Sequence, residues 1–165
     1  VLLVDLEAQR VRATVALRPG DEPGRVIADP TGRFFVALRR GGAVVSIDSQ
    51  SGQISERRAV CATPRGLAYD AAQSRLYVAC QSGELVTLGP TGAPLRTLLL
   101  DPERRDLRDV LLINGQVYLT RFRSAELLAI TPEGTIASTS APPVASASVC
   151  GTDSCTRPVR SSREW

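Results

Sequence analysis

Short apolar runs, separated by Gly, Pro and polar residues, recur along the first 136 positions of the chain. The run Phe35-Val-Ala-Leu38 has a period of two, with Phe35 and Ala37 expected on one face and Val36 and Leu38 on the other. Gly or Pro interrupts the pattern roughly every 8–12 residues, as between the short strands of all-β proteins. The absence of a 3.6-residue apolar spacing argues against a helical solenoid.

A unit of about 40 residues occurs three times after an incomplete first copy. Each unit predicts a strand, a tight turn and a second strand, then a third strand, a turn that ends in Gly, and a fourth strand. The paired strands are expected at 24–38, 65–80 and 108–121, the third strands at 43–48, 84–88 and 126–131, and the turn glycines at Gly52, Gly92 and Gly134. The ranges 1–5 and 11–17 match the third and fourth strands of such a unit.

Four antiparallel strands repeated at this period predict the blades of a β-propeller. A β-sandwich is the alternative, but it would not explain the repeat. We expect about three and a half blades, a half unit at 1–23 and full units at 24–64, 65–107 and 108–136, which cannot close a ring. Residues 137–165 are rich in Ser, Thr, Ala, Pro and Arg and are expected to form a disordered tail or linker.

The repeated residues resemble the YVTN-type propeller repeat of surface-layer and quinoprotein-like proteins. The tetrapeptide of that family is matched by Phe35-Val-Ala-Leu38, Tyr77-Val-Ala-Cys80 and Tyr118-Leu-Thr-Arg121, and an Asp29-Pro-Thr-Gly32 turn precedes the first of them. The resemblance covers residues 1–136. It implies a scaffold that serves adhesion, redox partnering or lactonase-like hydrolysis, so it indicates the fold more than the function.

The basic residues are all Arg, because the chain contains no Lys and no His. Twenty Arg against 17 acidic residues give a net charge of +3. Without His the 165 residues cannot supply a Ser/His/Asp or Cys/His nucleophile, an imidazole metal ligand or the proximal ligand of a c-type haem. We expect no catalytic residue, no metal site and no cofactor in this chain.

One rim of the predicted blades gathers half of the Arg residues, because the loops after the second and fourth strands of each blade emerge there. Arg65 and Arg108 occupy the same position at the start of an innermost strand, whereas Arg25 is displaced by one residue and is expected to face the other way. We predict that this rim binds a protein or a small anion through guanidinium groups. Solvated Arg paired with nearby acids is the alternative. The candidate ligand-binding residues are Arg65, Arg108, Arg39, Arg40, Arg121 and Arg123.

Recurring Asp residues could suggest metal ligands, but Asp29, Asp48 and Asp70 each precede a turn, where Asp accepts backbone N–H bonds. We therefore predict turn caps. Phe35, Tyr69, Tyr77 and Tyr118 are expected to pack between blades, which leaves few aromatic residues for a nucleic-acid interface. No nucleic-acid partner is expected.

Cys61 and Cys80 are predicted to form a disulfide. Cys80 ends the second strand of a blade, and Cys61 precedes the first strand of that blade, so an antiparallel pair brings the two to one rim. A disulfide favours a periplasmic, cell-surface or secreted protein, whereas buried free thiols in the cytosol are the alternative. Cys150 and Cys155 are expected to form a local disulfide or to have no role. No apolar run is long enough to span a membrane.

The function predicted from these features is that of a non-catalytic scaffold for binding or spacing, located outside the cytosol. Two alternatives stay open: a fragment of a lactonase-like hydrolase whose metal ligands lie in missing blades, and a propeller that partners a c-type cytochrome. Because the terminal blades lack a neighbour, their apolar faces are also expected to favour self-association.

Overall fold

The computed structural model describes residues 1–100, 105–142, 146–147 and 159–160, and all the regular secondary structure in these ranges is β-strand. Three antiparallel sheets contain four strands each, joined in sequence order. The first is β3 (Pro23–Ala28), β4 (Arg33–Leu38), β5 (Ala43–Asp48) and β6 (Ile54–Ala59). The second is β7 (Pro64–Asp70), β8 (Arg75–Cys80), β9 (Glu84–Leu88) and β10 (Pro94–Leu99). The third is β11 (Leu107–Ile113), β12 (Gln116–Arg121), β13 (Leu127–Ile130) and β14 (Ile136–Ser140).

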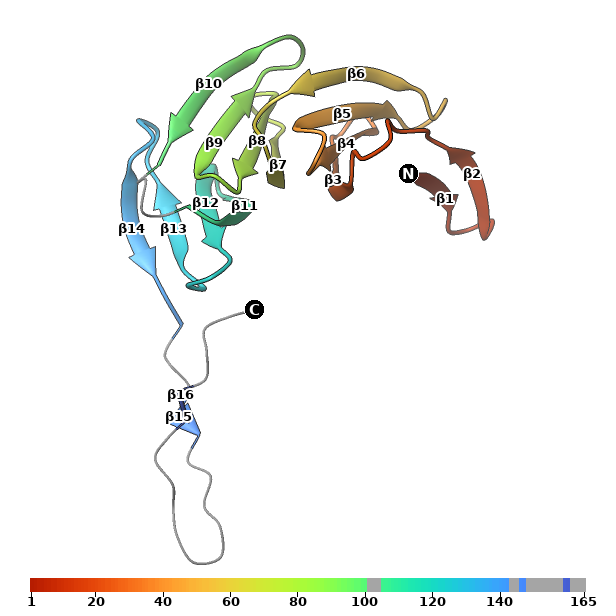
Figure 1. Ribbon diagram of the computed structural model, residues 1–165. Coiled ribbons are helices and arrows are strands. Elements are labelled where there is room, and N and C mark those ends of the chain that lie inside the picture. The colour runs from red at the N-terminus through yellow and green to blue at the C-terminus, as the bar shows by residue number, and fades with distance from the viewer. Residues whose placement is uncertain (101–104, 143–145, 148–158, 161–165) are drawn as a thin grey trace, which may run out of the picture.

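The sheets stand side by side in an open arc, preceded by the hairpin of β1 (Leu2–Asp5) and β2 (Arg10–Thr14) (Figure 1). Strands β3, β7 and β11 lie on the inner side of the arc, and β6, β10 and β14 lie on the outer side. Each sheet is therefore one blade, with its first strand innermost. The prediction of three and a half blades of a β-propeller is confirmed. None of the described residues form a helix with the length and apolar character needed to cross a membrane.

The last blade extends further than the sequence pattern suggested. Strand β14 includes residues 137–140, which we assigned to the tail, because Ser138, Thr139 and Ser140 pair with β13 through the backbone. Four of the five residues of β14 are exposed, so this outermost strand forms without apolar side chains. The remainder of the predicted tail contains only one described pairing, between β15 (Ser146–Ala147) and β16 (Val159–Arg160). Cys150 and Cys155 lie outside the described residues.

The core consists of apolar layers between neighbouring blades. Phe35 and Ala37 pack towards the second blade, whereas Val36 and Leu38 pack towards the β1–β2 hairpin, as their alternation predicts. The ring of Phe35 stacks on that of Tyr69 with centroids 5.7 Å apart, which confirms the inter-blade packing predicted for this pair. A third layer joins the second and third blades through residues such as Leu107. The core thus fixes each blade against its neighbour rather than filling a closed barrel.

Apolar side chains are exposed on the two terminal blades of the arc. Leu2 and Val4 of β1 are 58% and 51% exposed, and Leu111 and Ile113 of β11 are 41% and 50% exposed. Monomers rarely leave such patches uncovered, so we expect the chain to self-associate as its concentration rises. Sedimentation velocity over a hundredfold concentration range would measure this, and a Leu2→Ser/Leu111→Ser variant should associate less. A single monomeric species throughout would contradict the prediction.

Candidate anion-binding site

The innermost strand of each blade begins with a β-bulge. In β7 the register passes from Pro64 opposite Cys80 to Gly66 opposite Ala79, which leaves Arg65 without a partner on β8. In β11 it passes from Leu107 to Asp109 in the same way, so that Arg108 occupies the bulge. A bulge redirects the side chain of the extra residue. The repeat therefore places two Arg residues in equivalent, unusual backbone positions on neighbouring blades.

These side chains meet at a pocket of about 290 Å³. Its lining consists of Gly24, Arg25, Arg39, Arg65, Arg108 and Asp109. The prediction that Arg25 faces the other way is wrong. Strand β3 also gains a residue against β4, between Pro23 and Val26, and this bulge breaks the strict alternation on which that prediction relied.

Two of the four Arg residues are neutralised by carboxylates. Arg25 of the first blade forms an ion pair with Asp109 of the third blade. The Nη2 of Arg39 lies 2.7 Å from Glu22 Oε1. Among the described residues, none provides a hydrogen-bond partner for the buried Nε of Arg39. The charges of Arg25 and Arg39 are thereby balanced by carboxylates.

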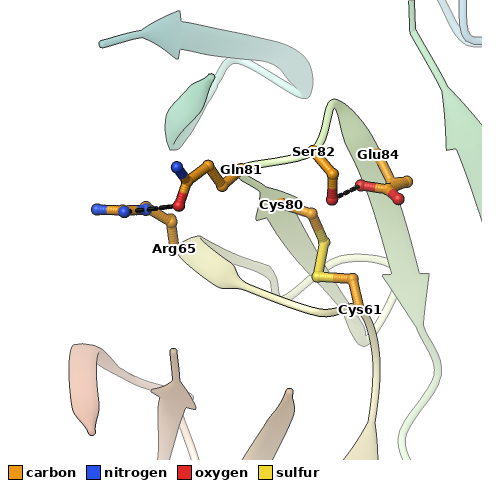
Figure 2. The surroundings of a disulfide bond; sticks show 6 residues. All are labelled: Cys61, Arg65, Cys80, Gln81, Ser82 and Glu84. Carbon is orange, nitrogen blue, oxygen red and sulfur yellow. Dashed lines mark hydrogen bonds between the residues drawn. A yellow bond between two sulfur atoms is a disulfide. The ribbon is translucent and has the colours of Figure 1, made fainter. Parts of the chain in front are cut away.

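Neutral groups hold the remaining two guanidiniums. Arg65 donates to Gln81 Oε1 from Nη2 at 2.7 Å and from Nε at 3.2 Å, and Figure 2 shows these two side chains meeting beside the end of β8. The guanidinium carbon of Arg108 lies 5.1 Å from the centre of the Phe122 ring, a cation–π contact. Within the described part of the chain, neither Arg65 nor Arg108 has an ion pair with a carboxylate.

The electrostatics of Arg65 reflect this crowding of like charges. Burial lowers the pKa of its guanidinium, the charges of Arg39 and Arg108 lower it further, and Glu22 offsets only part of the effect. The Arg65 guanidinium stays charged at any physiological pH, since the ordinary pKa of Arg lies far above that range. The cost of holding these cations together would be relieved by an anion in the pocket.

Gly66 allows the second and third blades to approach closely at the pocket. A Cβ at this position would lie 2.5 Å from Asp109 Cα and 2.7 Å from Val110 N, which is closer than real Cβ atoms come to backbone. We did not predict this role, although a Gly within a strand is a signal of close backbone approach.

The predicted disulfide between Cys61 and Cys80 is present, with Cα atoms 6.4 Å apart. It ties the segment before β7 to the end of β8, where Gln81 follows directly (Figure 2). The pairing therefore fixes both sides of the Arg65–Gln81 contact. A disulfide of this kind is typical of an oxidising compartment.

The other three predicted Arg residues do not line the pocket. Arg40 is exposed, and its backbone N–H donates to Asp21 O at 3.2 Å. Arg121 is bound on both sides, at 2.9 Å to Asp106 and 2.7 Å to Glu126, so the alternative of Arg paired with nearby acids holds for this residue. Arg123 is exposed and contacts Asp106 through its backbone N–H.

The recurring Asp residues cap turns, as predicted. Asp29 Oδ1 accepts from the backbone of Thr31 and Arg33, and the same pattern occurs at Asp48 and Asp70. Among the residues that the structure describes, no three His, Cys, Asp or Glu side chains gather as metal ligands would.

A test of the Asp29 cap is the pH dependence of stability. Burial raises the pKa of Asp29, but hydrogen bonds from Thr31 and Arg33 lower it by more, so the net shift is downwards. The stabilisation is therefore fully present above the unfolded pKa of about 4 and is lost as the pH falls through the folded value. We expect Asp29→Asn to lower the free energy of unfolding by about 1–3 kcal/mol at pH 7. In urea titrations from pH 7 to pH 2 the gap to the wild type should narrow below pH 4, and a constant gap would contradict this origin.

No family model matches the chain, and no curated protein matches it. Solved structures do resemble it. A catalytically inactive virginiamycin B lyase from Staphylococcus aureus with quinupristin, in which a histidine is replaced by alanine, superimposes with a TM-score of 0.72 at 12% identity over 85% of this chain. Hydrazine synthase of Kuenenia stuttgartiensis gives 0.65 at 13% identity over 79%, and glutaminyl cyclase of Myxococcus xanthus gives 0.53 at 18% identity over 70%.

These likenesses show the propeller fold alone, since all the identities are low. The chain spans 47% of the lyase, 38% of the hydrazine synthase chain and 53% of the cyclase. It therefore corresponds to about half of these structures or less.

Proposed function

We propose that this chain is a non-catalytic propeller scaffold of the YVTN type, which binds an anionic ligand through the pocket of Arg65 and Arg108. The observation that carries the proposal is that Arg65 and Arg108 line one pocket while, among the described residues, neutral groups and no paired carboxylate contact their guanidiniums. Arg presents a planar fork of donors that matches carboxylate and phosphate oxygens. The ligand is a small anion or an acidic group on a protein partner.

The proposed location is outside the cytosol, in the periplasm, on the cell surface or in the secreted fraction. The Cys61–Cys80 disulfide supports this, because reducing compartments keep most thiols free. The same bond positions Gln81 next to Arg65, so an oxidising environment would also preserve the site.

A propeller enzyme is the second candidate, favoured by the similarity to a lyase and a cyclase. In that case the reactive groups would lie in the part of the fold that this chain does not span. Elemental analysis of the purified chain tests whether its own residues hold a metal, which the scaffold proposal does not expect. Stoichiometric calcium or zinc would contradict the scaffold proposal.

Anion binding is tested by NMR, through the Arg Nε–H signals during titration with sodium phosphate at constant ionic strength. We expect the signals of Arg65 and Arg108 to shift and those of Arg10 and Arg75 to stay, because the latter two are exposed elsewhere on the surface. Arg65→Gln/Arg108→Gln should weaken binding at least tenfold, the loss of one or two charge-assisted hydrogen bonds. Arg10→Gln/Arg75→Gln removes the same charge and should retain affinity within twofold. Equal losses in the two variants would show that only net charge matters.

A further inference from the structure

The pocket is built for a particular kind of anion. Four Arg residues line the pocket, and the carboxylates of Asp109 and Glu22 balance two of their charges. The net charge of the group is therefore +2. These two carboxylates pair with Arg25 and Arg39. The excess charge therefore resides on Arg65 and Arg108.

The two excess charges converge on one location. Arg65 and Arg108 occupy equivalent bulges of β7 and β11, and the backbones of these strands approach closely at Gly66. The charge of Arg108 lowers the pKa of Arg65, as expected of guanidiniums near one another. Such an arrangement suits two negative charges on one centre better than two charges at the ends of a chain.

We infer that the pocket recognises the phosphate group of a phosphate monoester. This inference rests on the proposed anion-binding function and narrows it to one chemistry. A monoester carries close to two negative charges at neutral pH and offers three acceptor oxygens. It can accept from both guanidinium forks at once and balance the net charge of the pocket. A volume of about 290 Å³ also fits a compact group rather than an extended polyanion.

Gln81 has a defined part in this selectivity. It holds Arg65 through an amide oxygen, at 2.7 Å, and so positions the guanidinium without cancelling its charge. Glu at this position would accept the same hydrogen bonds but would reduce the net charge of the pocket to +1. Gln81 is thus a positioning residue, and Gln81→Glu changes the charge without changing the shape.

The test is calorimetric titration of the full chain at pH 7.5 with phenyl phosphate, phenyl sulfate and succinate. Phenyl sulfate has the same tetrahedral shape but one charge, and succinate has two charges on separate carboxylates. We expect phenyl phosphate to bind at least tenfold more tightly than either. Gln81→Glu should abolish this preference while the thermal unfolding midpoint stays the same, and Arg10→Gln/Arg75→Gln should retain it.

The other outcomes of this titration distinguish failure of the phosphate inference from failure of the proposed anion-binding function. Equal affinity for phenyl phosphate and phenyl sulfate would show that the second charge is not recognised. Succinate as the tightest ligand would assign the pocket to dicarboxylates. Either result overturns the phosphate inference and leaves anion binding intact, whereas no binding of any of the three anions would overturn both.

Discussion

Loss of the Cys61–Cys80 disulfide is expected to lower the free energy of unfolding by about 3 kcal/mol, because the bond closes a loop with a sequence separation of 19. For a chain of this length that corresponds to a fall of about 6–12 °C in the unfolding midpoint. The bond joins the segment before β7 to the end of β8, next to Gln81. We therefore also expect reduced protein to bind phosphate more weakly than oxidised protein.

The measurement is chemical denaturation of the oxidised and the reduced wild type, which keep all sulfur atoms in place. The same comparison in a Cys150→Ser/Cys155→Ser variant separates the effect of the Cys61–Cys80 bond from that of any bond between Cys150 and Cys155. A Cys61→Ala/Cys80→Ala variant adds the loss of packing at Cys80, which is fully buried, and should be less stable still. Identical midpoints for the oxidised and reduced wild type would show that the disulfide does not stabilise the fold.

Replacement of Gly66 by Ala is the second change with a large expected effect. The added methyl group would overlap the backbone of Asp109 and Val110, which a rigid strand cannot clear by a side-chain rotation. Overpacking of this kind costs about 1–3 kcal/mol. Because β7 and β11 would be forced apart, Arg65 and Arg108 would separate, and phosphate binding should fall together with stability.

Gly89→Ala is the matched control for this variant. A Cβ at Gly89 would make ordinary contact with the side chain of Leu95, the nearest atom being 3.4 Å away. Thermal unfolding should therefore show a much smaller change for Gly89→Ala than for Gly66→Ala. Equal changes would mean that close approach of the blades is not what Gly66 provides.

Local pattern was sufficient to predict much of the fold. Strands β5 and β9 have the bounds expected from alternation and from the turn glycines that follow them. The Asp29 turn and the Cys61–Cys80 pair followed from residue chemistry and antiparallel geometry. The end of β14 did not, because an outermost strand is held by its backbone and needs no apolar side chains.

The site was harder to predict because it depends on contacts between blades. Arg65 and Arg108 were visible as equivalent positions in the repeat, but we did not predict the bulge that redirects Arg25, although Gly24 within it is a signal of a bulge. The role of Gln81 depends on which loop side chain reaches Arg65. The sequence spacing of Arg65 and Gln81 does not reveal this contact, since the two residues are 16 positions apart and meet only in the folded chain.

The central claim is that Arg65 and Arg108 act on one anion, and a double-mutant cycle tests it most directly. Phenyl phosphate affinity would be measured for the wild type, Arg65→Gln, Arg108→Gln and the double variant. If both guanidiniums contact the same group, the loss in the double variant should differ from the product of the single losses by about fivefold or more, a coupling of about 1 kcal/mol. Losses that simply multiply, or single variants that bind like the wild type, would contradict the claim.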